Sequence, residues 1–337
     1  MAAYIIKRSL LAIFTLLMIL FVSYALLRLA PGDPTRSDSF AGNGQQGTID
    51  AKSGALHENT SLREKLALDK PVLTGFALWL RAAVADGDFG SSASVEPGRS
   101  VTGMISERLP VTLKLNLLAI LLTYLLAIPI GVYSASRAGG IADRTMEFLL
   151  FVLYSLPLMW VGLLLQSLFC EGGKFPLFPL NSQIANAGEL NIWQYQLAEL
   201  HILILPAVCL SYAGFAGLSR YARSSVLQNI NSDYIRTAYA KGLGTHTVLW
   251  NHAFRNALIT MITLFSGILP SLVSGSLLIE YIFGIPGMGS LSFNALESRD
   301  YPLLMALFTF TGALTLAGIF ISDLLYMAAD PRIRLHK

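Results

Sequence analysis

Charge is scarce in this chain of 337 residues. Asp, Glu, Lys and Arg make up 13% of it and apolar residues 54%, whereas about a quarter of a soluble domain is charged. Cysteine is scarcer still: Cys170 and Cys209 are the only two, too few for the disulfide framework of a small secreted protein. The composition therefore excludes an ordinary soluble domain and a disulfide-stapled one, and it favours a protein of the lipid bilayer.

Motifs for nucleotide and metal binding are also lacking. A phosphate-binding loop needs Gly-x-x-x-x-Gly-Lys followed by Ser or Thr. The one Gly-Lys pair, Gly173-Lys174, lacks both the upstream glycine and the following hydroxyl. The five histidines show no metal-ligand spacing apart from a weak pair, His246 and His252. We therefore predict a chain that is not an enzyme, binds no cofactor or metal, and takes its energy from another subunit.

Long uncharged runs are what the sequence has in abundance. There are six of them, each at least 19 residues long, which is enough to cross about 30 Å of hydrocarbon at 1.5 Å per residue. The sequence therefore predicts an all-α integral membrane protein with six transmembrane helices. The runs are Ser9–Leu27, Leu115–Ser136, Phe148–Cys170, Leu200–Ser219, Asn256–Ile279 and Tyr301–Ser322.

The distribution of Lys and Arg predicts the orientation of these helices. With a cytosolic N-terminus, the inside segments 1–8, 137–147, 220–255 and 323–337 hold twelve basic residues against five acids. The short outside loops hold only Lys174 and Arg299 against six acids. Both termini are therefore expected in the cytosol.

The first run is expected to stay in the protein as a membrane span. Lys7-Arg8 before an apolar segment is also typical of a secretory signal, but the run is longer than a usual signal core and no small-residue cleavage site follows it. We divide the chain into residues 1–29 (cytosolic N-terminus and first span), 30–108 (an extracytoplasmic loop or small domain) and 109–337 (a five-helix transmembrane core that includes a cytosolic segment, 220–256).

The extracytoplasmic region is expected to hold two helices, Ser61–Leu68 and Val72–Ala85, the second with Pro71 at its start and Trp79 on its apolar face. Residues 36–60 include a Gly- and Gln-rich patch, and Asp38–Leu56 is either an ordered part of this region or a disordered loop.

The stretch DYIRTAYAKGLGTHTVLWNHAFRNAL, from Asp233 to Leu258, is basic and amphipathic although it lies between two apolar runs. Gly242 and Gly244 divide it into two short helices. Ser232 or Asp233 is expected to cap the first helix and Thr245 the second, and Gly242 suits the left-handed position that ends a helix. Ala238 and Gly242, four apart, form a small-residue patch on one helical face. A polar segment held between membrane spans indicates contact with something in the cytosol.

This stretch resembles the cytoplasmic coupling loop, the EAA loop, of importer-type ABC transporter permeases. The triplet positions read Arg236-Thr237-Ala238 instead of Glu-Ala-Ala, with the glycine at Gly242, and the later Ile-x-Leu-Pro reads 252–255 His-Ala-Phe-Arg. Both departures are typical of the branch that imports oligopeptides, dipeptides and nickel. Two alternatives are a solvated charged loop and a DNA-binding helix-turn-helix, but the neighbouring apolar runs leave the latter no free access to a groove.

The resemblance covers most of the chain, apart from residues 36–60 and 181–198, and it implies a six-helix type I importer permease fold with an extracytoplasmic insertion after the first helix. It fits the first-permease, B-type component, with a leaning towards the microcin C and peptide sub-branch; a nickel or other small-solute importer is the alternative. The coupling-loop residues that it marks are Asp233, Arg236, Thr237, Ala238, Lys241, Gly242, Leu243, Gly244 and Arg255.

The resemblance also implies partners in a bacterial inner membrane. They are a homologous second permease, two ABC ATPase subunits that use ATP, an extracytoplasmic substrate-binding protein and a peptide-like substrate, with no nucleic acid.

Polar residues inside spans are costly and tend to face a bundle interior or a water-filled path. Gly residues near Pro270 also allow a kink in the fifth span. Ordinary helix packing is the alternative explanation for each residue. The candidate pathway and hinge residues are Asn116, Gln166, Ser266, Pro270, Ser274 and Gly275.

Glu280 and Asp323 each end a span, where an acid is expected to be solvated. A proton-coupled secondary transporter would need ionisable residues at mid-membrane, which these uncharged runs lack, and a non-transporting scaffold would leave the coupling loop unexplained.

Overall fold

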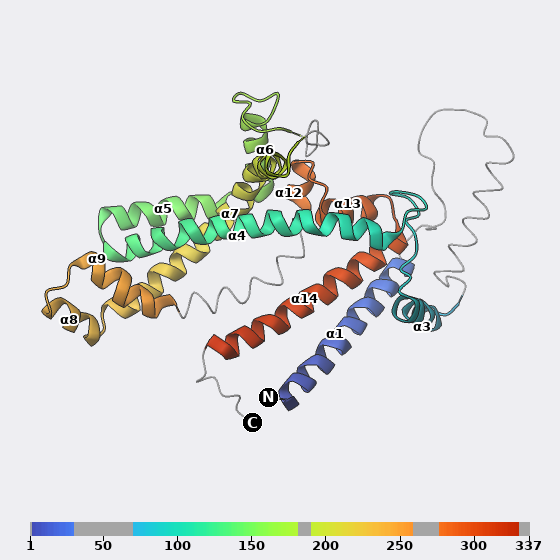
Figure 1. Ribbon diagram of the computed structural model, residues 1–337, viewed down its shortest axis with the longest axis horizontal. Helices are drawn as coiled ribbons and strands as arrows, with labels where there is room; N and C mark the ends of the chain where they lie inside the picture. The colour runs from blue at the N-terminus through green and yellow to red at the C-terminus, as the bar shows by residue number, and fades with distance from the viewer. Residues whose placement is uncertain (1, 30–69, 181–189, 259–275, 330–337) are drawn as a thin grey trace. The chain divides into compact units, whose positions relative to one another are not determined.

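The computed structural model describes residues 2–29, 70–180, 190–258 and 276–329 (Figure 1). Helices account for most of these residues. No strand forms among them, and the only extended pairing is at two isolated bridges, Ser91 with Ser100 and Cys170 with Phe178. The prediction of an all-α protein is confirmed. The chain divides into two compact units, residues 1–109 with 291–316 and residues 110–290 with 317–337.

The first unit contains α1 (Ala2–Leu29), α3 (Val72–Arg81) with the π-helical turn η1 (Ala82–Asp86), and most of α14 (Tyr301–Ala329). It also holds the first turns of α4 (Val101–Ser136) and most of α13 (Met288–Glu297). The helix expected at 72–85 is present, and Pro71 occupies its N-cap position. The one expected at 61–68 lies outside the described residues.

The core of the first unit is aromatic. Trp79 of α3 is 5% exposed and packs with Tyr24 of α1 and with Tyr301 and Met305 of α14. The Phe76 ring meets Phe21 of α1 edge to face, with 5.4 Å between the ring centroids. The expected burial of Trp79 is confirmed, and its face of α3 attaches this helix to α1 and α14.

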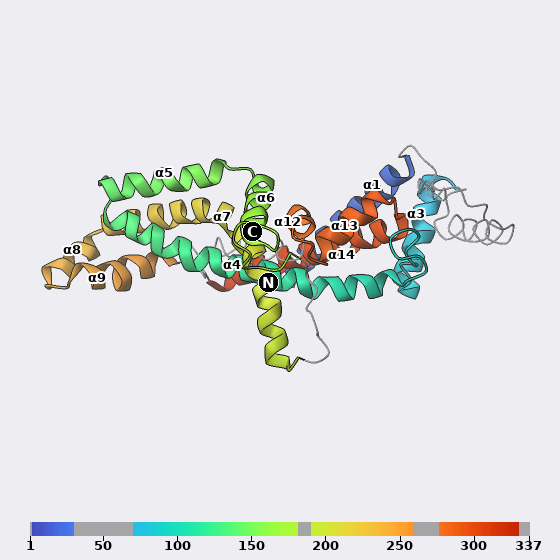
Figure 2. The same ribbon diagram turned by 90° about the horizontal axis from the view of Figure 1, so that it is seen from above.

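The second unit is built on α4, α5 (Ile141–Ser155), α6 (Leu158–Phe169) and α7 (Ile192–Ile230). Three short helices follow α7: α8 (Asp233–Ala240), α9 (Thr245–Thr247) and the π-helical η2 (Val248–Phe254). The helix α12 (Leu277–Ile282) packs against α6 and α7 around buried Cys209 and Ile279. Both views show α4, α5 and α7 side by side (Figures 1 and 2).

Four of the described helices are long and apolar enough to cross a membrane: Ile6–Leu29, Val101–Ser136, Ile192–Tyr212 and Tyr301–Leu324. Four of the six predicted runs lie in these helices wholly or in large part. A fifth span is possible if α5 and α6 count as one. Most of the predicted run 256–279 lies outside the described residues, so the count of six stays a prediction.

The expectation of one straight helix over Phe148–Cys170 is wrong. The chain bends by 94° between α5 and α6. Leu156 adopts φ −75° and ψ 132°, because the ring of the following Pro157 disfavours the helical conformation for the residue before it. Pro157 then serves as the N-cap residue of α6. A proline in an apolar run therefore divides this segment into two helices.

The helices α4 and α7 approach each other closely at Gly131. A Cβ atom on Gly131 would lie 2.5 Å from the Cβ of Ala222 and 2.5 Å from the carbonyl oxygen of Ser219. A similar Cβ on Gly214 of α7 would lie 2.8 Å from a methyl carbon of Thr123 on α4. Small residues permit this backbone contact, as is common between membrane helices.

We expect Gly131→Val to force α4 and α7 apart. Overpacking of this kind costs about 1–3 kcal/mol, so the midpoint of thermal unfolding in detergent should fall clearly. Gly217→Ala on α7 is the matched control, because a Cβ there meets nothing within 4 Å. Equal midpoints for the two variants would contradict the close approach.

Candidate functional site

The segment after α7 folds as the two short helices that the sequence predicts. Gly242 has φ +77°, which confirms the left-handed position. Its N–H donates to the carbonyl of Tyr239 at 2.9 Å, and the N–H of Leu243 donates to that of Ala238 at 3.4 Å. This pair of bonds is the Schellman motif, which satisfies the last carbonyls of α8. The turn therefore depends on the glycine.

The predicted N-caps are only partly right. Ser232 is the N-cap residue of α8, but its hydroxyl donates back to the carbonyl of Asn229 instead of capping the helix. The prediction for Thr245 is wrong: Gly244 is the N-cap residue of α9 and Thr245 is already helical. Gly244 is extended, at φ −67° and ψ 151°. The helix therefore begins one residue earlier than it would if the hydroxyl of Thr245 were its N-cap.

One face of this helical pair is buried within the chain. Ile235 and Ala238 of α8 join Val248 and Ala253 of the following helix in a cluster whose other buried members are Val132, Ala135, Val226 and Ala257. The cluster seats the pair on the cytosolic ends of α4 and α7, as those ends are predicted from the charges. Ala238 is 5% exposed, so the expected surface patch of Ala238 with Gly242 does not form. Ala238 follows Ile235 by three positions and shares its inward face.

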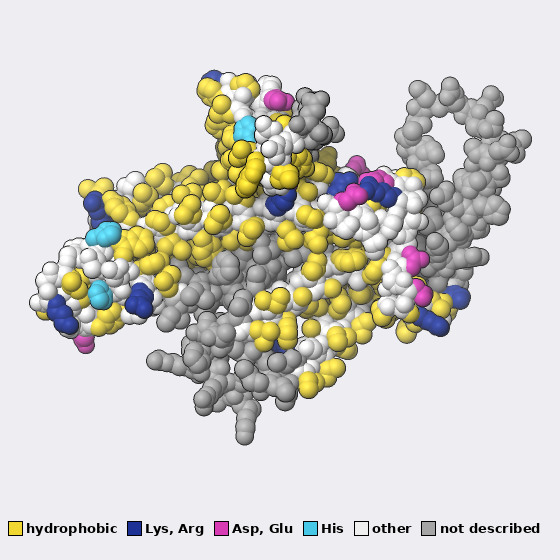
Figure 3. Space-filling view, viewed as in Figure 1, with side chains coloured by type: hydrophobic (Ala, Val, Ile, Leu, Met, Phe, Trp, Pro, Cys, Tyr) yellow, Lys and Arg dark blue, Asp and Glu magenta, His cyan; other side chains and the backbone are white. Residues whose placement is uncertain are grey.

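The opposite face is exposed, and we call it the outer face. It combines two cations with aromatic and aliphatic side chains, since Tyr239 is 46% exposed and Leu243 is 36% exposed. The pair of Arg236 with Asp233, at 3.6 Å, is exposed on both sides and adds little stability. Figure 3 shows basic side chains over this end of the molecule. The outer face consists of Asp233, Tyr234, Arg236, Thr237, Tyr239, Lys241, Gly242, Leu243 and Gly244.

Tyrosine and arginine beside an aliphatic residue are typical anchors of protein interfaces. The opposite face of the same helices is packed in the buried cluster, so the side chains of the outer face are attached to a well-packed support. Arg255, the remaining predicted coupling residue, is also exposed and follows η2.

A buried ion pair lies next to this segment and was not predicted. Arg223 of α7 donates from Nε to one carboxylate oxygen of Asp143 at 2.8 Å and from Nη2 to the other at 2.7 Å. Asp143 also accepts from the Ser134 hydroxyl and, at 2.8 Å, from the N–H of Gly139. Its side chain is 1% exposed, and Glu147 lies 3.2 Å from Nη1 of Arg223.

We call this arrangement the Asp143 clamp. It joins the end of α4, the start of α5 and the C-terminal third of α7. The hydrogen bonds from Arg223, followed by those from Ser134 and Gly139, hold the pKa of Asp143 well below its usual range in spite of burial. Eighty positions separate the two partners in the sequence, and no local motif marks them.

Glu280 is buried, and the expectation that it would be solvated is wrong. Its Oε1 accepts from the hydroxyl of Thr112 at 3.0 Å and from the N–H of Ser276 at 3.4 Å, and its Oε2 accepts from the N–H of Ser290 at 3.0 Å. The Thr112 oxygen in turn accepts from the N–H of Met288 at 2.8 Å. The carboxylate thus occupies the positive end of α13, and donors from three segments compensate its burial.

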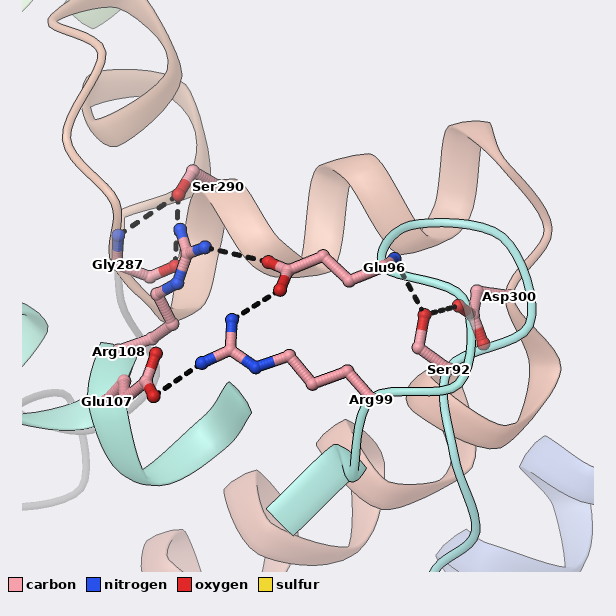
Figure 4. Close-up of polar contacts among 8 residues, drawn as sticks. All are labelled: Ser92, Glu96, Arg99, Glu107, Arg108, Gly287, Ser290 and Asp300. Atoms are coloured by element: carbon pink, nitrogen blue, oxygen red, sulfur yellow. Dashed lines mark hydrogen bonds and ion pairs between the residues drawn. The ribbon is translucent and has the colours of Figure 1, made fainter. Parts of the chain in front are cut away.

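Asp300 organises the first unit in a comparable way (Figure 4). It precedes α14, and its Oδ1 accepts from the N–H of Leu303 as an N-cap does. Its Oδ2 accepts from the Ser92 hydroxyl and from the N–H groups of Ala93, Ser94 and Val95. One carboxylate therefore fixes the loop before α4 to the start of the last helix.

The same loop continues into a surface network of charges. Glu96 pairs with Arg99 and, at 3.2 Å, with Arg108, and Arg99 also pairs with Glu107 (Figure 4). The hydrogen bond from Arg99 is the main reason why the pKa of Glu96 is lowered. These groups are partly exposed, so their contribution to stability is small.

The candidate pathway residues are placed only in part. Asn116 lies on α4 and is 9% exposed. Gln166 of α6 donates to the carbonyl of Ile282 at 2.5 Å, which is a packing contact between α6 and the end of α12. The other four, Ser266, Pro270, Ser274 and Gly275, lie outside the described residues, so the hinge at Pro270 stays a prediction.

The fold and this segment define a helical membrane protein in which two short helices, packed on α4 and α7, carry an exposed surface with basic and aromatic side chains. The chain belongs to the family of binding-protein-dependent transport system inner membrane components, whose pattern matches residues 127–335. A second pattern, for the N-terminal part of such membrane components, matches residues 1–116. The resemblance drawn from the coupling loop is therefore confirmed.

Relatives match over nearly their whole length. The oligopeptide transport system permease protein AppB of Bacillus subtilis (strain 168) is 38% identical, over 99% of each chain. The peptidoglycan transport system permease protein YejB of Agrobacterium fabrum is 32% identical, over 99% of this chain and 98% of its own. The dipeptide transport system permease protein DppB of Bacillus subtilis (strain 168) is 32% identical, over 100% and 99%.

We expect Arg223→Ala to destabilise the second unit, because it leaves the Asp143 carboxylate buried without its cation. Removing one partner of a buried pair costs about 3–5 kcal/mol, and the partial exposure of Arg223 places the expected loss at the lower end. The midpoint of thermal unfolding measures it. Arg144→Ala, an exposed arginine of α5, is the control.

The same clamp predicts a pH dependence. Since folding lowers the pKa of Asp143, the stabilisation is fully present above the pKa of an unfolded aspartate, about 4, and is lost as the pH falls through the lower value in the fold. The difference in stability between the wild type and Arg223→Ala should therefore shrink only at acid pH. A difference that is constant down to about pH 2 would contradict this role of the pair.

Proposed function

We propose that this chain is the peptide-translocating permease subunit of an ATP-driven importer, in which it forms half of the pathway. The names of the relatives support a substrate of the oligopeptide or dipeptide class. The observation that carries the proposal is the outer face. It is an exposed surface with two cations, two tyrosines and Leu243, held on a buried cluster that leads directly to α4 and α7.

The proposed assembly has a second, homologous permease, two cytosolic ATPase subunits and an extracytoplasmic binding protein that delivers the substrate. The chain is then non-catalytic, and the ATPase subunits bind and hydrolyse the ATP. The lack of a phosphate-binding loop in the sequence supports this division of labour.

The contacts of the second unit suggest how ATP hydrolysis moves the membrane helices. An ATPase that pushes on the outer face displaces α8 and η2 together, because Ile235, Ala238 and Val248 share one cluster. The cluster passes the displacement to the ends of α4 and α7, and the Asp143 clamp adds the start of α5. Two arrangements of these packed helices would then open the pathway alternately to each side.

Both termini and the outer face are proposed to be cytosolic, with residues 30–108 outside and the core at 109–337. Single cysteines in a background without Cys170 and Cys209 test this. On intact cells, an impermeant thiol reagent should label a cysteine at Val84, which is 77% exposed, and should leave one at Lys241 unmodified until the cells are opened. Labelling of position 241 on intact cells would contradict the orientation.

Transport itself is tested with the purified assembly in liposomes. Uptake of a peptide delivered by the binding protein should require ATP, and a proton gradient alone should drive none. Uptake driven by protons without ATP would overturn the proposal in favour of a secondary transporter.

Gly242→Val should impair the coupling between the ATPase subunits and the permease, although the site lies outside the predicted membrane spans. A side chain at φ +77° costs about 1–2 kcal/mol, more for a β-branched residue, so the Schellman turn and the outer face are distorted. We expect substrate-stimulated ATP hydrolysis and peptide uptake to fall together by roughly an order of magnitude. Both are measured on the reconstituted assembly.

Two control variants replace a glycine in this segment without disturbing its backbone conformation. Gly242→Asn should retain most activity, because asparagine tolerates the left-handed region. Gly244→Ala should also retain it, because Gly244 is at φ −67° and a Cβ there meets nothing within 4 Å. Normal ATP hydrolysis and uptake in Gly242→Val would remove the assignment of the outer face as the coupling surface.

A further inference from the structure

A hollow of about 570 Å³ lies between α5 and α7. Its base is formed by Ala216 and Gly217 of α7, and the rings of Tyr154 and Tyr221 are part of its lining. Arg220 and Ser224, one helical turn further along α7, add a guanidinium and a hydroxyl. A Cβ on Gly217 would meet nothing within 4 Å, so the space there is open.

Arg220 is the uncompensated charge of this hollow. Its exposed guanidinium makes no hydrogen bond or ion pair with any residue in the described part of the chain. Arg223, which also lines the hollow, is by contrast occupied by Asp143 and by the other charged lining residue, Glu147. The carboxylates of Asp143 and Glu147 therefore pair with Arg223. The guanidinium of Arg220 remains available to bind an anion.

The hollow lies where the bilayer surface is expected. Arg220 follows directly on the uncharged run 200–219, and Glu147 precedes the run 148–170. On the membrane side of Glu147, Phe148 and Phe151 of α5 are 65% and 62% exposed. Phe151 lies about one helical turn after Glu147 and about one turn before Tyr154, so all three are on the same face of α5. The hollow, which is polar, thus lies next to an apolar surface at the expected level of the membrane surface.

We propose that this hollow binds the headgroup of an anionic phospholipid of the cytosolic leaflet. The guanidinium of Arg220 matches a phosphate with two parallel hydrogen bonds, Ser224 and the two tyrosines supply hydroxyl groups, and the acyl chains lie along Phe148 and Phe151. Basic pockets between membrane helices on the cytosolic side are suited to such headgroups. The assignment to the cytosolic leaflet rests on the proposed orientation, whereas the binding itself does not.

The chemistry favours a lipid over the carboxylate of a transported peptide. Both anions suit a guanidinium, but the surface next to Arg220 on α5 is apolar over two turns, which suits acyl chains. The bound lipid would brace α5 against α7 beside the Asp143 clamp.

The test measures binding of phosphatidylglycerol and of neutral phosphatidylcholine to the purified assembly in detergent, by native mass spectrometry over a lipid titration. The wild type should prefer phosphatidylglycerol. Arg220→Gln should weaken phosphatidylglycerol binding about fivefold, since one arginine near the membrane surface contributes about that factor, and should leave phosphatidylcholine unaffected. Gly217→Leu should fill the open space without strain and reduce binding of phosphatidylglycerol at least as much.

Arg144→Gln is the matched control, because it removes an exposed arginine of α5 outside the hollow, and its lipid binding should equal that of the wild type. Equal phosphatidylglycerol binding by the wild type, Arg220→Gln and Gly217→Leu would overturn the proposal. So would a loss of peptide binding in Arg220→Gln with unchanged lipid binding, which would assign the hollow to the substrate, or dissociation of the second permease, which would assign it to that contact. Failure of ATP-driven uptake in the wild type would refute the proposed function and leave the lipid titration valid.

Discussion

The bidentate pair of Arg223 with Asp143 is the interaction on which the packing of α4, α5 and α7 depends. A carboxylate with a side chain 1% exposed is tolerable only because a guanidinium, a hydroxyl and a backbone N–H all donate to it. Those donors come from α4, the turn before α5, and α7, so satisfying the charge also fixes three helices. The inner cluster of Ile235, Ala238 and Val248 rests on two of the same helices, and the outer face inherits its rigidity from them.

The two other buried carboxylates in the described part of the chain, Glu280 and Asp300, follow the same rule at helix starts. Glu280 accepts from Thr112, Ser276 and Ser290 at the start of α13, and Asp300 accepts from the loop at 92–95 and from the first turn of α14. In each case, a buried carboxylate supplies an acceptor for backbone N–H groups near the start of a helix. Three of the acids that a count of loop charges assigns to solvent, Asp143, Glu280 and Asp300, are therefore buried and connect neighbouring segments.

The parts predictable from the sequence are those with a local signal. Long uncharged runs indicate the spans, and a glycine after an amphipathic helix indicates the turn at Gly242. The bend at Leu156–Pro157 was also visible in principle, because a proline excludes the residue before it from the helical region. The clamp and the environment of Glu280 were not, because their partners lie 80 and 168 positions away and charge alone does not say which acid is buried. Ala238 was misplaced for a similar reason: helical spacing relates it equally to Ile235 and to Gly242, and only the packing on α4 and α7 decides which side faces inward.

Burial on one side and exposure on the other is what a coupling element requires. If both faces of α8 and η2 were solvated, a push from an ATPase would be absorbed by movement of the segment alone. If both were buried, no ATPase could reach it. Here Ile235 and Ala238 are in the cluster, whereas Tyr239 and Leu243 are exposed, so the proposed ATPase contact on the outer face would act on helices that are packed directly against α4 and α7. The Schellman turn connects the two helices at the one glycine with a positive φ in this segment, and a strained residue there would disturb the connection between them.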